Sequence, residues 1–138
     1  MARVEAAYAE AVPASWRAAA GVRFELIGGS TSWSLTNGRM EISQFHANGD
    51  YTHLKAVLAH EFGHIVAFRW GTQAFLGAAP DGWPAFGPSP EESWSDCVSL
   101  AFVGVNDPSP GLSPCSGASL AWTADWLAAG PAAHTRTN

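Results

Sequence analysis

Apolar positions follow a helical spacing in the first part of the chain. They recur at every fourth position, at Val4, Tyr8, Val12 and Trp16. This spacing places them on one face of a helix, so residues 1–20 are predicted to be helical. Because proline lacks an amide hydrogen and blocks the preceding turn, Pro13 should divide the segment into two short helices.

The pattern changes to short alternating runs of apolar and polar residues between residues 23 and 43. The runs are residues 23–27, 31–36 and 39–43. Such alternation is typical of strands with one buried face. Gly28-Gly29 favours a turn after the first run, and Asn37-Gly38 is a hairpin signal before the last. We therefore expect a small antiparallel sheet of about three strands.

Three helices are predicted in the rest of the chain. The longest should begin near Asp50 or Thr52, both good N-caps, and end at Gly71, a typical C-cap. Its apolar positions are Leu54, Val57, Leu58, Ile65 and Phe68. Residues 71–90 carry four glycines and four prolines, which predicts a loop. The other helices are expected at about residues 91–102 and 117–128. The core should include Trp33, Trp94, Trp122 and Trp126.

The composition is that of one acidic domain with few charges. Of its 138 residues 14% are charged, against about 25% in an average soluble domain. Seven Lys and Arg against twelve Asp and Glu give a net charge of −5, which disfavours nucleic acid and anionic membranes as partners. No apolar run approaches the ~18 residues of a membrane span, so membrane insertion is not expected. We expect a single monomeric domain, 1–138, with segments 1–20, 23–43, 51–104 and 105–138.

The two cysteines favour a location outside the cytosol. Cys97 and Cys115 lie eighteen positions apart, across a segment rich in Pro and Ser. An even cysteine count with this spacing favours one disulfide, and two separate thiols are the alternative. The N-terminus shows no secretory signal pattern. With the disulfide formed, we expect a secreted or cell-envelope protein whose signal peptide is not part of this sequence.

The strongest chemical signal is the HExxH sequence His60-Glu61-Phe62-Gly63-His64 within the long helix. Four residues advance a helix by about 400°, so the two histidines project from the same face, one turn apart. Two imidazoles in this arrangement can bind one zinc ion at Zn–N distances of about 2.0–2.1 Å. Glu61 stands at the position of a general base that activates a zinc-bound water. The alternative is a plain helix with a chance motif and two solvated histidines.

A catalytic zinc usually has three protein ligands, so a third must be found. The metzincin extension fails, because Ala67 and Trp70 stand where it requires Gly and His. Glu92 and Asp96 form an ExxxD unit at a predicted helix start, and their spacing puts both on one face. Glu92 can then bind the metal, while Asp96 accepts the second ring N–H of a liganding histidine. Glu91 competes for the ligand role but has no acid four residues later.

HExxH followed by ExxxD on a later helix resembles the gluzincin branch of zinc metallopeptidases, to which thermolysin belongs. At this length the chain is similar to the very small members, the minigluzincins, over about residues 23–102. The resemblance implies one catalytic Zn²⁺ with ligands His60, His64 and Glu92, general base Glu61 and supporting acid Asp96. Together with the predicted elements it gives an α+β fold: a small antiparallel sheet packs on the motif helix, followed by the glutamate helix and a C-terminal helix.

These signals predict a zinc-dependent endopeptidase, whose peptide or protein substrate is implied by the resemblance alone. An edge strand at residues 32–36 or 39–43 could hold an extended peptide by backbone pairing. Family members commonly supply an oxyanion-stabilising Tyr or His after the glutamate helix, where this chain has only His134. Tyr51 and His53 precede the motif, so the donor stays open between these three residues and none. A non-catalytic zinc-binding interaction module derived from a peptidase is the alternative function.

Overall fold

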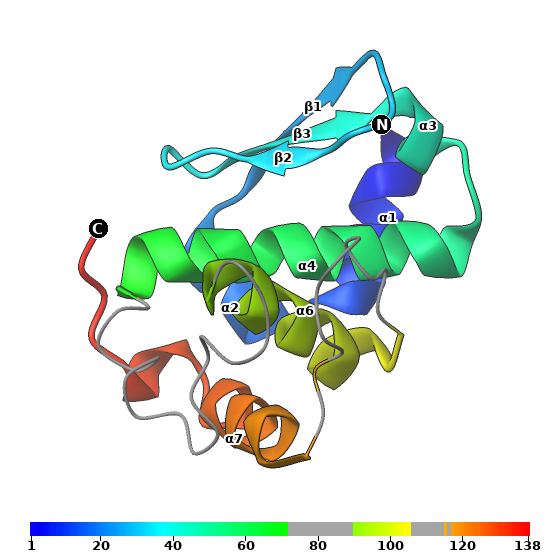
Figure 1. The fold of residues 1–138 in the computed structure, drawn as a ribbon. Helices are drawn as coiled ribbons and strands as arrows, with labels where there is room; N and C mark the ends of the chain where they lie inside the picture. Colours follow the sequence, from blue (N-terminus) through cyan, green and yellow to red (C-terminus); the bar gives the residue numbers. More distant parts are fainter. Residues whose placement is uncertain (72–89, 106–114, 116) are drawn as a thin grey trace.

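The computed structural model describes residues 1–71, 90–105, 115 and 117–138. It has the predicted α+β architecture, with a three-stranded sheet and several helices. The elements are α1 (Ala2–Ala11), α2 (Ala14–Ala20), β1 (Arg23–Ile27), β2 (Trp33–Ser34), β3 (Arg39–Ser43), α3 (Gln44–Ala47), α4 (Tyr51–Trp70), α6 (Pro90–Val103), α7 (Gly117–Ala128) and a short 3-10 helix, η2 (Pro131–Ala133). Figure 1 shows α4 crossing the middle of the molecule, between the sheet and the pair α6 and α7. Most of the predicted 71–90 loop lies outside the described residues.

The predicted helix boundaries are confirmed where the structure describes them. Pro13 separates α1 from α2. The side chain of Asp50 caps α4 by accepting a hydrogen bond from the backbone N–H of His53, at 2.9 Å. At the other end, Gly71 adopts the left-handed conformation of a helix C-cap, with φ of 69°. The ends of α4 are therefore fixed by local capping signals that the sequence carries.

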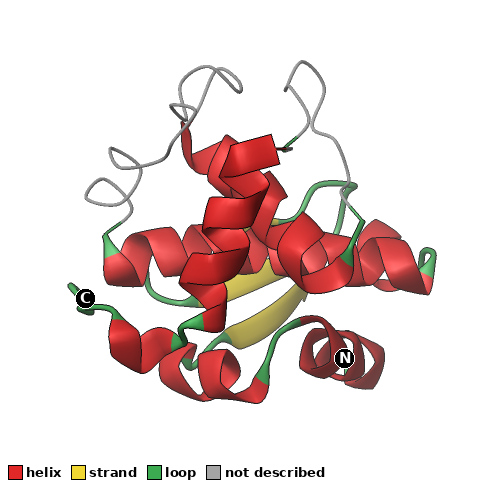
Figure 2. Ribbon diagram, turned by 90° about the horizontal axis from the view of Figure 1, so that it is seen from below, coloured by secondary structure: helices red, strands yellow, loops and turns green. Residues whose placement is uncertain are grey.

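Helix α4 is buried on nearly all sides. Four of the five predicted apolar positions are buried and Phe68 is half-buried, but small residues on other faces, such as Ala56, Ala59 and Gly63, are buried as well. Helix α1, strand β2 and helix α6 all pack against α4. In the view from below, the strands lie behind the helices (Figure 2). A helix covered on every side is the centre of the domain, and its side chains are held firmly.

The sheet is mixed, so the predicted antiparallel sheet is wrong for one strand pair. The strand order is β1-β3-β2, and β3 pairs with β2 in antiparallel and with β1 in parallel orientation. Asn37-Gly38 correctly predicts the β2–β3 hairpin, in which Gly38 has a φ of 83°. The chain reverses after β1, as Gly28-Gly29 predicts, but β2 lies on the far side of β3. Alternation indicates that one face of a strand is buried, whereas the pairing partner of the strand depends on residues far along the chain.

Strand β2 is shorter than predicted, and its tryptophan faces solvent. Only Trp33 and Ser34 pair with β3, opposite Glu41 and Met40. Trp33 was expected in the core but is 51% exposed, since it shares the outer face of the sheet with Glu41. Ser34 shares the inner face with the buried Met40 and so turns toward α4. Trp94 is fully buried, as expected.

Helix α6 approaches α4 very closely at one point. A Cβ atom built on Gly63 would lie 2.7 Å from Ser95 Cα and 2.8 Å from Ser95 Oγ, so this position requires glycine. Two buried hydrogen bonds join the same helices: Trp94 Nε1 donates to Gly63 O at 3.0 Å, and Ser99 Oγ donates to Ala56 O at 3.0 Å. These contacts fix the position of α6 along α4.

The predicted disulfide is present. Cys97 in α6 is bonded to Cys115, just before α7, with a Cα–Cα distance of 5.2 Å. Both cysteines are buried, so the bond ties the C-terminal part of the chain to α6 from inside. A disulfide is compatible with an extracellular protein. Within the described ranges, none of the helices combines the length and the apolar character that crossing a bilayer demands.

Gly63→Ala is expected to destabilise the protein by about 1–3 kcal/mol, because its methyl group overlaps the Ser95 backbone. This cost exceeds the gain in helix propensity from Gly to Ala. Urea denaturation followed by circular dichroism measures the change. Ser95→Gly in the Gly63→Ala background should restore only part of the loss, since Ser95 Cα would still lie 2.7 Å from the new Cβ. A Gly63→Ala variant as stable as the wild type would contradict the close approach.

Replacing Cys97 and Cys115 together by serine should lower the free energy of unfolding by about 2–4 kcal/mol, because the unfolded chain loses a closed loop. Urea denaturation of the oxidised wild type and the double variant compares the two. Thiol titration is the control: native protein should show no reaction for this pair, and reduced protein should show two thiols. The same titre before and after reduction would contradict the bond.

Candidate metal centre

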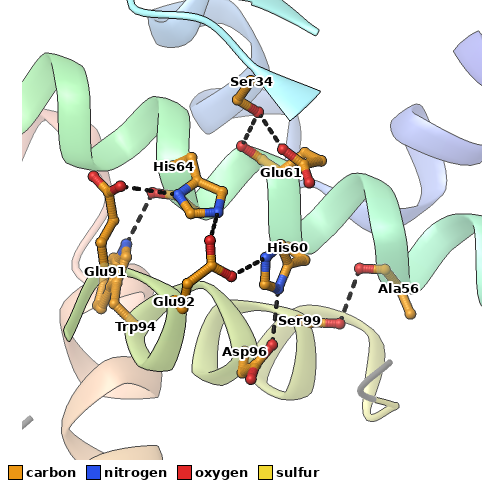
Figure 3. A network of polar contacts seen from close by, with 11 residues as sticks. Ser34, Ala56, His60, Glu61, His64, Glu91, Glu92, Trp94, Asp96 and Ser99 are labelled. Atoms are coloured by element: carbon orange, nitrogen blue, oxygen red, sulfur yellow. Dashed lines mark hydrogen bonds and ion pairs between the residues drawn. The ribbon is translucent and has the colours of Figure 1, made fainter. Parts of the chain in front are cut away.

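The two histidines of the HExxH sequence project from one face of α4, as their spacing requires. Their ring centroids lie 5.1 Å apart. Both are nearly buried, with 9% of His60 and 7% of His64 exposed. The Nε2 atoms of both rings face Glu92, in the first turn of α6 (Figure 3). Helix α4 thus presents two imidazole nitrogens to the neighbouring helix.

Glu92 lies between the two imidazoles. Its Oε2 atom is 3.1 Å from His60 Nε2, and its Oε1 atom is 3.0 Å from His64 Nε2. Its side chain is 36% exposed, in contrast to the nearly buried histidines. The structure therefore brings the residue that the sequence proposes as third ligand to both histidines at once.

Each imidazole has a second carboxylate at its other nitrogen. His60 Nδ1 donates to Asp96 Oδ1 at 2.8 Å, and Asp96 is 1% exposed. His64 Nδ1 lies 3.2 Å from Glu91 Oε2. The ExxxD spacing explains the first contact, because Glu92 and Asp96 lie on one face of α6. The motifs indicate Glu91 only as a competing ligand and do not predict its position beside His64, although its place directly before Glu92 was a signal.

The surrounding carboxylates determine the charge of the imidazoles. Burial lowers the pKa of His60, but hydrogen bonds to Asp96 and Glu92 outweigh this effect and raise that pKa to about 9. Burial likewise lowers the pKa of His64, and hydrogen bonds to Glu91 and Glu92 raise it to about 10. Hydrogen bonds from both histidines hold the pKa of Glu92 well below its usual range. The raised pKa values favour protonated imidazoles on both sides of this carboxylate, and a divalent cation would supply positive charge in their place.

Glu61 lies beside the histidines, and its carboxylate accepts a hydrogen bond from the sheet. It is 7% exposed, and burial raises the pKa of its carboxyl group. The charges of His64 and His60 and a hydrogen bond from Ser34 act in the opposite direction. Ser34 Oγ, on β2, is 2.8 Å from Glu61 Oε2 (Figure 3). One oxygen of Glu61 is thus engaged on the side away from α6.

The donor set fits a metal ion. His60, Glu61 and His64 are buried and offer ligand atoms within 4.8 Å of one another. Glu92 adds a carboxylate within hydrogen-bond distance of both Nε2 atoms. Imidazole and carboxylate groups are ligands that zinc takes in proteins, and other divalent metals accept them too. The residues of this cluster could therefore hold one metal ion.

The three residues considered as oxyanion donors lie in other environments. His134 stacks on Trp126 with ring centroids 3.6 Å apart, and its Nε2 atom is 2.8 Å from Trp126 O. The hydroxyl of Tyr51 donates to the carboxylate of Glu10. His53 is close to His46, with ring centroids 5.5 Å apart. Tyr51 and His53 are in the first turn of α4, about 10–20 Å along the helix axis from the HExxH histidines.

Comparisons with models of protein families, with curated proteins and with solved structures found no match to this chain. The likeness to gluzincins therefore rests on the HExxH and ExxxD motifs and on the expectations drawn from them. Because a fold alone does not determine an activity, the function has to be argued from the chemistry of this cluster.

Asp96→Asn should weaken zinc binding by about 10–100-fold, because the hydrogen bond that orients His60 loses its charge. Competition with a chromophoric chelator measures the dissociation constant. Asp125→Asn, on the exposed side of α7, removes the same charge elsewhere and should leave zinc affinity unchanged. Glu92→Gln should weaken binding more than Asp96→Asn does, since it changes the proposed ligand itself. Equal affinities for all four proteins would show that zinc binds at another place.

Proposed function

We propose that the protein is a zinc-dependent endopeptidase with one catalytic Zn²⁺ held by His60, His64 and Glu92. The observation that carries the proposal is the Glu92 carboxylate, which lies 3.1 Å and 3.0 Å from the Nε2 atoms of the two histidines. A chance pair of histidines on a helix would have no reason to meet an acid from a separate helix. The support of His60 by the buried Asp96 strengthens this reading.

Glu61 gives the proposed zinc site its chemistry. It accepts a proton from the attacking water and later donates that proton to the leaving amine. Zinc, when bound, lowers the pKa of water and polarises the scissile carbonyl group. Burial raises the pKa of Glu61. A raised pKa makes a carboxyl group a stronger base, as a group that has to take up a proton requires.

The position of β2 supports an extended peptide as substrate. The order β1-β3-β2 makes β2 an edge of the described sheet, and Ser34 links it to Glu61. A peptide that pairs with this edge lies beside the general base, and its main chain supplies the binding contacts. Residues 39–43, the other strand considered for this role, form the central strand β3 and are therefore excluded.

A non-catalytic zinc-binding module is the second candidate. The observation that favours it is the position of the three proposed oxyanion donors, His134, Tyr51 and His53, away from the cluster. Losing one such donor typically lowers the rate by about 10²–10³. Glu61 opposes this candidate, because a structural zinc site does not need a general base.

We further propose that the protein acts outside the cytosol, as a secreted or cell-envelope monomer. The buried Cys97–Cys115 disulfide supports this location, because such bonds persist in oxidising compartments. The net charge of −5 supports a peptide or protein substrate over nucleic acid, which requires a basic surface.

Glu61→Gln is expected to lower peptide cleavage by at least about 10²-fold while zinc stays bound, because the amide cannot accept the proton. Zinc-loaded wild type and variant are incubated with a diverse peptide mixture, and mass spectrometry identifies the cuts. Glu5→Gln, an exposed acid on α1, is the matched control and should cleave like the wild type.

Three results of this digestion lead to different conclusions. Cleavage by the wild type and not by Glu61→Gln supports the endopeptidase, and the cut sites describe its specificity. Absence of cleavage by both, with one zinc ion bound to each, supports the non-catalytic module. Equal cleavage by both would contradict the assignment of Glu61 as the base.

A further inference from the structure

Ser34 is a residue to which the mechanism above gives no role. Its Oγ atom is 2.7 Å from the backbone carbonyl oxygen of Glu61 and 2.8 Å from Glu61 Oε2. Both distances suit O–H···O hydrogen bonds. Figure 3 shows the other carboxylate oxygen of Glu61 pointing away from β2. One serine thus contacts two acceptors of the same glutamate.

The hydroxyl group of Ser34 has a single hydrogen, so it donates to one of these acceptors at a time. While Glu61 is ionised, the carboxylate is the better acceptor, because a charge-assisted hydrogen bond is about twice as strong as a neutral one. The charged Oε2 is therefore the acceptor that Ser34 holds, and the carbonyl oxygen, 2.7 Å from Ser34 Oγ, is the second acceptor within reach.

The hairpin that carries Ser34 is attached firmly to α4. Ser34 faces the helix because its neighbour Trp33 faces solvent on the alternating strand. At the turn of the hairpin, Arg69 Nη2 donates to Asn37 O at 3.4 Å. Glu61 and Arg69 are eight residues apart, so the two attachments are separated by about 12 Å along the helix. Two contacts at this spacing align the hairpin along α4, over the general base.

We propose that Ser34 is a positioning residue for Glu61. It holds Oε2 of the ionised carboxylate at β2, so that Oε1 faces the attacking water. The proton passes from water to Oε1 and from Oε1 to the leaving amine, while the hydroxyl hydrogen stays on Ser34 throughout. This inference rests on the proposed endopeptidase function. Under it, one edge strand positions both the peptide and the base.

The test compares Ser34→Thr, which keeps a hydroxyl group, with Ser34→Val, whose side chain has the shape of threonine but no hydroxyl group. Zinc content and Tm are measured first, and kcat and KM follow on a fluorogenic peptide that the wild type cleaves. Ser34→Val should lower kcat by about 10- to 100-fold, with little change in KM, because a hydrogen bond to a charged group is lost. Ser34→Thr should stay within about threefold of the wild type, since it retains the donor.

Two further measurements separate this role from a merely structural one. Thr36→Val removes a hydroxyl group from the exposed part of the same hairpin and should leave kcat unchanged. In protein with ¹³C-labelled glutamate carboxyl groups, the Glu61 signal is assigned with Glu61→Gln. This signal should move in Ser34→Val and keep its position in Ser34→Thr, whether or not the protein cleaves peptides.

The outcomes distinguish the role of Ser34 from the proposed function. Equal kcat values for Ser34→Thr and Ser34→Val, or an unmoved Glu61 signal in Ser34→Val, would overturn the role of Ser34 and leave the endopeptidase intact. Failure of the zinc-loaded wild type to cleave any peptide would overturn the endopeptidase, and with it the part that Ser34 takes in catalysis.

Discussion

The candidate site depends on how closely α6 approaches α4. At Gly63 the missing side chain lets the backbone of Ser95 come within a distance that a Cβ atom would block. Trp94 and Ser99, which flank Ser95 in α6, then donate hydrogen bonds to the carbonyl groups of Gly63 and Ala56 in α4. Because α6 is fixed in this way, Glu92 in its first turn lies between the two imidazoles. A glycine inside the motif is therefore a packing requirement of this helix pair.

Charge is the second constraint on the site. Four carboxylates and two imidazoles share a largely buried space: Glu61, Glu91, Glu92, Asp96, His60 and His64. Bringing charged groups out of water costs free energy unless each one is paired, so such a cluster adds little to stability. Each imidazole instead has a carboxylate at both of its nitrogens, which fixes the orientation of its ring. The pairing thus gives the cluster a defined geometry, an arrangement that is common where ionisable groups gather at functional sites.

Features that depend on residues close in sequence could be predicted, whereas contacts between distant residues could be predicted only where a motif or a cysteine pair pointed to them. The spacing of the HExxH histidines, the caps of α4 and the β2–β3 turn are local, and the structure contains all of them. The parallel pairing of β1 with β3 is a long-range property, and the alternating pattern does not encode it. If Trp33 were buried, as expected, Ser34 would face solvent. The contact between Ser34 and Glu61 was therefore not predicted. Likewise, the approach of Glu91 to His64 follows from packing between two helices and not from either motif alone.

The division of the site between two helices also has a thermodynamic consequence. The histidines come from α4 and the acids from α6, so an ion bound there would join segments that separate when the chain unfolds. Binding to the folded state alone makes stability a function of free ion concentration, worth about 2.7 kcal/mol at one hundred times the dissociation constant. The surroundings would then control the lifetime of the protein through the metal they supply, and scarcity of that metal would expose the chain to degradation.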